Sequence, residues 1–397
     1  MAHGRVVTVL VVAFAAIFAG GMLWGATTDD LVFIHHSSGQ NWLTNSLDAA
    51  LVAKDYIDER NDIYYGTDVT PDAGRPDSLG PVPGDCTNMN HWLPWFNDYL
   101  SAIKTTGVAT GVNRIVMFKS CFPISDVAAD GASPGDPFSS TQTIANYQAV
   151  YRNVNGAGST YTRNSYSYLA LQEIFAANPD TLFIPVTAPP LSNPSTTDAN
   201  AHRARLFNEW LTTDWLGAYN AAHPGLNNVA VFDWFDLLAN PDNAASYPNR
   251  LRAAYGGTNS DSHPNSAGNA YSTQLFATNA KNFIDEAWER FVYDPGDANG
   301  DGLVDGGDLA IWQQNYDPRG TNAATNRWVL GDWNGDGKVD GGDLALWQQN
   351  YDPLGVIGKS AGVSASLDTQ SVPEPTSILL AVTSAAAGLL VRRRRRG

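Results

Sequence analysis

A segment of twelve residues occurs twice near the C-terminal end of the chain, with the same sequence following each copy. The first copy reads DANGDGLVDGGD over 297–308, and the second reads DWNGDGKVDGGD over 332–343, 35 residues later. LAIWQQNY follows the first copy, and LALWQQNY follows the second. Two copies in phase predict a duplicated unit of one loop and one helix, which a solvated acidic linker would not produce.

Oxygen-bearing side chains stand at positions 1, 3, 5, 9 and 12 of each copy, and glycine stands at position 6. This is the pattern of an EF-hand loop, in which the carbonyl at position 7 completes the oxygen shell of calcium. Residues 294–353 hold eleven Asp and three basic residues, a net charge of −8 that a cation would offset. We therefore expect two Ca²⁺ ions. Their expected ligands are Asp297, Asn299, Asp301, Leu303, Asp305 and Asp308 in the first copy and Asp332, Asn334, Asp336, Lys338, Asp340 and Asp343 in the second.

Position 12 is Asp in both copies, and one helix is expected after each loop. Over residues 294–353 this arrangement resembles a type I dockerin, the module that attaches enzymes to cohesin-bearing scaffolds. The resemblance implies a cohesin-like partner. Loop positions 10 and 11 are Gly306-Gly307 and Gly341-Gly342, where cellulosomal dockerins often carry Ser-Thr-like contacts. The identity and existence of that partner therefore stay open.

The N-terminal end has the features of a secretory signal. Arg5 precedes an apolar run from Val6 to about Ala19, and small residues lead to a polar start at Thr27. We expect a signal peptide over residues 1–26, with an uncleaved N-terminal anchor as the alternative. Either alternative implies export through the inner membrane to the cell surface or the medium.

The C-terminal end has three parts: Pro373-Glu374-Pro375, an apolar stretch over about 378–391, and five arginines at 392–396. After a linker over 354–371, residues 372–397 resemble the PEP-CTERM sorting signal of exopolysaccharide-producing bacteria. The resemblance implies recognition by the PEP-CTERM sorting machinery at the membrane and a transient or retained membrane segment. A simple C-terminal tail anchor is the alternative.

Charge and composition exclude one class of partner. Lys and Arg number 24 against 40 Asp and Glu, and without the two end segments the balance becomes 18 against 39, or −21. A chain this acidic is a poor nucleic-acid binder. The hydrophobic content of 43% is enough for a folded core.

Residues 29–291 alternate between expected strands and helices. The strands are expected at 31–34, 114–118, 181–186 and 228–232, and the long helices at 199–222 and 267–291. Alternation of this kind predicts an α/β fold with a parallel sheet covered by helices. In such sheets the functional residues gather at the carboxyl ends of the strands.

Ser37 follows the first expected strand directly, and His263-Pro264 precedes the last long helix. This pairing resembles the SGNH (GDSL-like) hydrolases, which are esterases and lipases with a flavodoxin-like three-layer α/β/α sandwich. The resemblance implies Ser37 as nucleophile and His263 as general base. The usual acid three residues before the histidine is Ser260 here, so either Asp261 orients His263 or the site is a Ser–His dyad.

The third block of the SGNH pattern, Gly-x-Asn-Asp, falls on Lys119-Ser120-Cys121-Phe122, so the oxyanion asparagine is absent. The candidate oxyanion donors are Gly39, Ser120 and Asn88, and Asn90 lies in the same loop as Asn88. Export permits a disulfide, and the two cysteines allow one pairing, Cys86–Cys121. A bridge and two separate thiols are both open.

Structural roles compete with these assignments. Ser37 and Ser38 would also suit a helix cap, and His263 before Pro264 would suit a loop. His35 and His36, with His91, are an alternative metal group, although no acidic partner stands at motif spacing. Most tryptophans are expected in the core, with one or two available to stack on a sugar ring.

The sequence thus predicts an exported serine esterase that removes acyl groups, chiefly acetyl, from polysaccharide. No cofactor is expected for catalysis. The polysaccharide part rests on association, because dockerins and this sorting tail are common on carbohydrate-processing proteins. A non-catalytic, glycan-binding or structural surface protein with a degenerate SGNH-like domain is the alternative, and a lipid substrate is a further one.

Overall fold

The structure is a computed structural model that describes residues 29–64, 88–109, 111–156, 158–322 and 326–355. The expected signal peptide, Cys86, nearly all of the linker and the sorting tail lie outside the described residues. Within the described ranges, no helix combines the length and the apolar character needed to cross a membrane. The described residues form an α/β region, residues 29–292, and a repeat region, residues 294–355.

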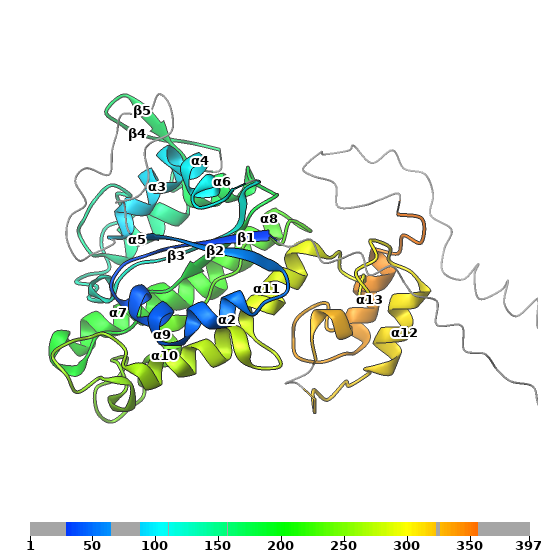
Figure 1. Ribbon diagram of the computed structural model, residues 1–397. Coiled ribbons are helices and arrows are strands. Elements are labelled where there is room, and N and C mark those ends of the chain that lie inside the picture. The colour runs from blue at the N-terminus through cyan, green and yellow to red at the C-terminus, as the bar shows by residue number, and fades with distance from the viewer. Residues whose placement is uncertain (1–28, 65–87, 110, 157, 323–325, 356–397) are drawn as a thin grey trace, which may run out of the picture. The chain divides into compact units, whose positions relative to one another are not determined.

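Four parallel strands form the main sheet of the α/β region, in the order β2-β1-β3-β6 (Figure 1). They are β1 (Asp29–His35), β2 (Ile57–Tyr64), β3 (Asn113–Lys119) and β6 (Leu182–Val186). The middle of β1, Leu31 to Ile34, is fully buried, as expected for a strand covered on both faces. Since all four strands run in one direction, the residues that follow β1, β3 and β6 meet at one edge of the sheet.

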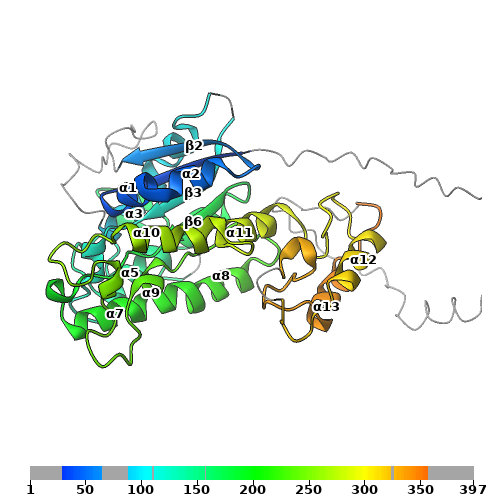
Figure 2. The same ribbon diagram turned by 60° about the horizontal axis from the view of Figure 1, so that its bottom comes forward.

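Helices cover both faces of this sheet (Figure 2). Val32 and Ile34 of β1 belong to the hydrophobic cluster on one face, and Leu31 and Phe33 belong to the cluster on the other. The first face is covered by α3 (Trp92–Asp98), α4 (Leu100–Thr105), α5 (Ile144–Tyr151), α6 (Leu171–Ala176), α7 (Asp198–Glu209), η5 (Trp210–Trp215) and α8 (Leu216–Ala222). The second face is covered by α1 (Ser38–Trp42), η1 (Leu43–Leu47), α2 (Asp48–Val52), α10 (Ser266–Thr273), η7 (Gln274–Thr278) and α11 (Phe283–Val292), while α9 (Trp234–Leu238) contributes to both clusters.

Short elements complete the α/β region. A hairpin joins β4 (Tyr161–Arg163) to β5 (Tyr166–Tyr168) in antiparallel register. The 3₁₀ turns are η2 (Met89–His91), η3 (Phe122–Ser125), η4 (Asn193–Ser195) and η6 (Ala253–Tyr255).

The prediction of an α/β fold with a parallel sheet is confirmed, and three of its details differ. Residues 228–232 do not form a strand. They make only two isolated bridges to β6, through Val229 and Phe232. The helix expected over 267–291 is interrupted after η7, because Asn282 caps a new helix by accepting a hydrogen bond from Asp285 N. Strand β2 was not expected from the sequence.

The repeat region contains two equivalent helices, α12 (Gly306–Gln314) and α13 (Gly341–Gln349), with the 3₁₀ turn η8 (Trp328–Leu330) between them (Figure 1). Its contacts are reciprocal: Trp312 Nε1 donates to Asp340 O at 3.0 Å, and Trp347 Nε1 donates to Asp305 O at 2.9 Å. Bridges Val304–Asp352 and Asp317–Val339 repeat the same symmetry. The two sequence copies therefore form one small module with internal twofold pseudosymmetry.

Candidate active site and calcium loops

The turn after β1 holds Ser37 in an unusual backbone conformation. Ser37 has φ 46° and ψ −96°, a positive φ that side chains rarely adopt. The turn also requires glycine at position 39, because a Cβ there would lie 2.5 Å from His35 Cβ. The chain thus reverses tightly from strand to helix and leaves Ser37 half-buried at the carboxyl edge of the sheet.

The loop before α10 brings His263 to this turn from 226 positions away. Ser37 Oγ donates a hydrogen bond to His263 Nε2. The ring of Phe122 lies edge-on to the imidazole, with ring centroids 4.8 Å apart. The structure therefore places a hydroxyl and an imidazole in the geometry of an activated nucleophile and its base.

Asp261 completes the group. Its Oδ1 accepts from His263 Nδ1 at 2.5 Å and from the backbone N–H of His263 at 3.1 Å. Burial raises the pKa of Asp261, but the hydrogen bonds from His263 outweigh that effect and leave the pKa lowered. The sequence left open whether a carboxylate orients His263. In the structure Asp261 occupies that position, two residues before the histidine.

Two serines that sequence reasoning missed hold this loop in place. The hydroxyl of Ser262 accepts from Ser192 N and pairs with Ser192 Oγ, each at 3.1 Å. Both side chains are buried. Ser262 thus points inward while Asp261 and His263 on either side of it face the site. A small polar residue between two site residues is the only sequence signal for this role.

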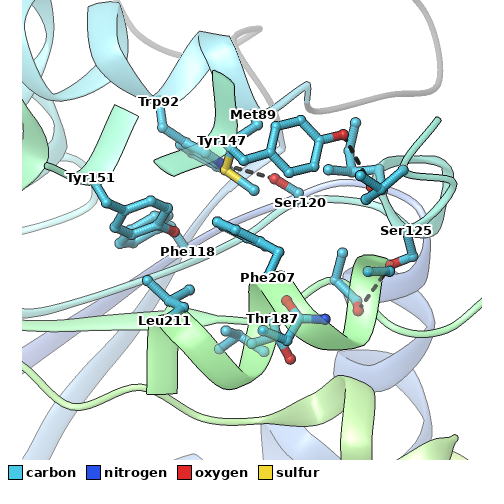
Figure 3. Close-up of a pocket in the computed structure, with 16 residues that line it drawn as sticks. Met89, Trp92, Phe118, Ser120, Ser125, Tyr147, Tyr151, Thr187, Phe207 and Leu211 are labelled. Atoms are coloured by element: carbon cyan, nitrogen blue, oxygen red, sulfur yellow. Dashed lines mark hydrogen bonds between the residues drawn. The ribbon is translucent and has the colours of Figure 1, made fainter. Parts of the chain in front are cut away.

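The expected oxyanion donors lie in different surroundings. Gly39 N already donates to His36 O at 2.9 Å. Ser120 Oγ accepts from Trp92 Nε1 at 2.8 Å and lines an interior cavity of about 10 Å³ that neither Ser37 nor His263 lines (Figure 3). That volume is room for one water molecule. Asn88 is half-buried at the start of η2, and its part in the site stays a prediction.

Other candidates near the turn have local partners. His35 Nε2 lies 3.4 Å from Asp62 Oδ2, and the ring of His36 packs against Tyr64. Cys121 is buried with its Sγ 3.6 Å from Ser38 Oγ. Because Cys86 lies outside the described residues, the Cys86–Cys121 bridge stays a prediction. Trp42, Trp92, Trp95 and Trp234 are core residues, and the ring of half-buried Trp210 stacks on Phe207, so a sugar-stacking tryptophan stays a prediction.

The two expected calcium loops share one pattern of internal hydrogen bonds, with more of these bonds in the first loop than in the second. In the first, Asp297 accepts from Gly300 N and Gly302 N, and Asp308 accepts from the N–H groups of Ala298, Asn299 and Asp305. In the second, Asp332 accepts from Gly337 N, and Asp343 accepts from Asn334 N and Asp340 N. Positions 1 and 12 are thus fixed by backbone N–H groups at both loops.

The donor chemistry of the first loop fits a hard cation. The pKa of Asp297 is raised to about 7, chiefly by burial. The neighbouring carboxylates of Asp308 and Asp301 raise it further, while the hydrogen bond from Gly302 N lowers it. Crowded carboxylates of this kind favour a bound cation. Among the described residues, however, no three His, Cys, Asp or Glu side chains converge as a formed metal site. The individual ligands therefore stay a prediction.

Comparison with known protein families matches residues 295–349 to the dockerin type I domain. The repeat region is thus a type I dockerin, a module that attaches its protein to a cohesin-bearing scaffold and that generally binds calcium. Such a module is typical of extracellular or cell-surface-attached proteins. Comparison with curated proteins found no match for this chain.

Proposed function

We propose that this chain is an exported serine esterase of the SGNH type that removes acetyl groups from polysaccharide. The observation that carries the proposal is the hydrogen-bonded series Ser37–His263–Asp261 at the carboxyl edge of a parallel sheet. Three residues with these roles define a serine-hydrolase site by geometry, whatever their order in the chain.

The proposed reaction proceeds through an acyl-enzyme. Ser37 Oγ attacks the ester carbonyl while His263 Nε2 takes its proton, and the tetrahedral intermediate collapses with cleavage of the ester C–O bond. The protonated imidazole returns that proton to the departing sugar oxygen, which leaves as a hydroxyl group. Water then repeats the sequence on the acyl-enzyme and releases acetate. Asp261 holds the Nδ1–H tautomer and stabilises the imidazolium.

The strand order supports the SGNH assignment. The order β2-β1-β3-β6 is the beginning of the flavodoxin-like order 2-1-3-4-5, and the bridges at Val229 and Phe232 lie where a fifth strand would continue it. Ser37 follows the first strand and His263 precedes α10, as in the family that the sequence resembles. The polysaccharide substrate rests on the dockerin and on the C-terminal segment that resembles a PEP-CTERM signal.

Labelling with a fluorophosphonate probe tests the proposal. The wild-type chain should label and hydrolyse p-nitrophenyl acetate, and Ser37→Ala should lose both activities by at least about 10³-fold while keeping its melting temperature. Ser101→Ala, which changes an exposed serine on α4, is the matched control and should label normally.

Two other outcomes would redirect the assignment. Failure of the wild type to label would refute the esterase and favour a non-catalytic glycan-binding protein. A preference for long acyl chains over acetylated polysaccharide would favour a lipid substrate. Release of acetate from acetylated polysaccharide, lost in Ser37→Ala, is the result that the proposal requires.

A further inference from the structure

A lysine occupies an interior position beneath the nucleophile turn. Lys119 is the last residue of β3, and the alternation of the strand places it on the same face as Ile115 and Met117. Its side chain is fully buried. Lysine is almost never fully buried without a specific partner, because removing its charge from water is costly. A cation at a position that packing alone would fill with an apolar residue calls for a functional explanation.

The contacts of Lys119 converge on the turn of Ser37. Its Nζ donates to the carbonyl oxygen of His36 at 3.2 Å and lies 5.8 Å from the ring centroid of Trp234. Its Cδ would be 3.3 Å from a Cβ at Gly39, so the alkyl chain runs directly under the turn. The carbonyl of His36, the residue before the nucleophile, therefore accepts from Gly39 N and from Lys119 Nζ together.

Cys121 contacts the other side of the same turn. Its sulfur lies 3.6 Å from Ser38 Oγ and also interacts with the backbone N–H of Ser38 and the side chain of His36. Ser37 is thus held on both sides: Lys119 binds the peptide before it, and Cys121 binds the residue after it. Both supporting side chains come from the end of β3 and the residues that follow it, where the SGNH pattern has a different sequence.

We infer that Lys119 is a positioning residue for Ser37, which together with Cys121 fixes the strained turn that presents the nucleophile. The inference rests on the proposed esterase function. The turn needs such support because a positive φ at a non-glycine residue persists only when surrounding contacts enforce it. A charged ammonium also makes a stronger hydrogen bond to the His36 carbonyl than a neutral amine would.

The protonation of Lys119 gives the inference a pH signature. Burial lowers the pKa of Lys119 to about 8, and the negative charge of Cys121 acts in the opposite direction. For Cys121, burial raises the pKa, but the charge of Lys119 and the hydrogen bonds from His36 and Ser38 outweigh it and lower the pKa to about 6. Among the described residues, His35 on β1 also faces Lys119. The ammonium charge is therefore present at pH 7 and lost as the pH rises through 8.

The experiment compares Lys119→Met with Lys104→Met in the full chain. Lys104 pairs with Asp180 near the start of β6, away from the site, and serves as the matched control. Lys119→Met should slow fluorophosphonate labelling and lower kcat by about 10- to 100-fold, with KM within about twofold, because a misplaced nucleophile affects chemistry rather than binding. Its melting temperature should not fall, since methionine removes a buried charge and keeps the alkyl volume. Lys104→Met should label at the wild-type rate.

Each alternative result is decisive. Normal labelling by Lys119→Met, or a loss of activity that parallels a loss of thermal stability, would overturn the positioning role while leaving the esterase intact. A wild-type chain that does not label would instead refute the esterase itself.

Two measurements on the wild type do not depend on how the variant folds. Labelling should decline above about pH 8, where Lys119 loses its charge, and the absence of that decline would contradict the inference. Titration of unreduced, denatured protein should find both cysteines as thiols. A Cys86–Cys121 disulfide would exclude the ionised sulfur and overturn the part assigned to Cys121.

Discussion

The repeat region and the α/β region place their functional residues in opposite ways. Each expected calcium loop draws all its ligands from twelve consecutive residues, whereas Ser37 and His263 are 226 positions apart. A local loop is specified by its own turn residues and hydrogen bonds. A distant pair is specified only by the sheet that brings the loops together. The calcium loops can therefore be predicted directly from their own sequence. The Ser37–His263 pair could be predicted only through a resemblance to a known family.

The two regions also differ in how they use positive φ angles. In the calcium loops these conformations belong to glycines, namely Gly300, Gly302, Gly335 and Gly337, for which they are inexpensive. In the turn after β1 the residue with positive φ is Ser37, which carries a side chain. A glycine suffices where the chain only has to turn. At this turn the residue with the strained backbone is the one whose hydroxyl the proposed chemistry requires.

Removal of calcium should separate the two regions most clearly. Chelation with EGTA should unfold the calcium loops, because their crowded carboxylates lose the cation that offsets them, while fluorophosphonate labelling should change by less than about twofold. Limited proteolysis followed by mass spectrometry would locate the cleavage sites. Cleavage within residues 294–353 with retained labelling is the expected result. A parallel loss of labelling would show that the regions depend on each other.

Replacement of the orienting carboxylate should have an intermediate effect. Asp261→Asn keeps the shape of the side chain but loses the charge that stabilises the imidazolium, so kcat should fall by roughly 10- to 100-fold. The loss should be smaller than for a buried triad aspartate, because the Asp261 side chain is 70% exposed. Asp180→Asn, with 63% exposure, is the control and should keep full activity. Equal activity of the two variants would favour a Ser–His dyad.

The smallest effect should come from relaxing the nucleophile turn. Ser37→Gly should be more stable than Ser37→Ala by about 1–2 kcal/mol, because glycine tolerates a positive φ that alanine does not. Both variants lack the hydroxyl and should be inactive, so the comparison isolates the backbone. Denaturant unfolding of the two proteins measures the difference. Equal stabilities would mean that Ser37 is not strained in solution.

The sequence predicted most of the sheet because its inner strands have an unambiguous pattern. The apolar runs at 31–34, 114–118 and 181–186 lie within or over β1, β3 and β6. Strand β2 was not predicted because its sequence, IDERNDIY, is mostly charged or polar, as an edge strand allows. Residues 228–232 are apolar enough for a strand, but they pair with β6 at only two positions. How many residues of this segment pair with β6 depends on the tertiary structure, so the local sequence does not predict it.

The residues of the candidate site could be chosen from the sequence, and their geometry could be predicted only in part. Ser37 and His263 could be chosen from their places before and after the expected elements. The spacing of Asp261 left its role open, since only the folded structure shows one carboxylate oxygen accepting from both Nδ1 and the backbone N–H of His263. Lys119 was read as part of a degenerate motif. Lys119 lies under the turn because β3 pairs directly with β1. No local sequence pattern reveals that pairing.

The exposure of Asp261 has a consequence for the lifetime of the proposed acyl-enzyme. Among the described residues, this carboxylate faces solvent and His263 is partly accessible, so water can reach the imidazole from that side. A branched polysaccharide could bind over an exposed Asp261–His263 pair without entering a tunnel. Water could also reach the acyl-enzyme as soon as the sugar alcohol leaves. For the proposed esterase, hydrolysis should therefore outpace transfer of the acyl group to a second sugar.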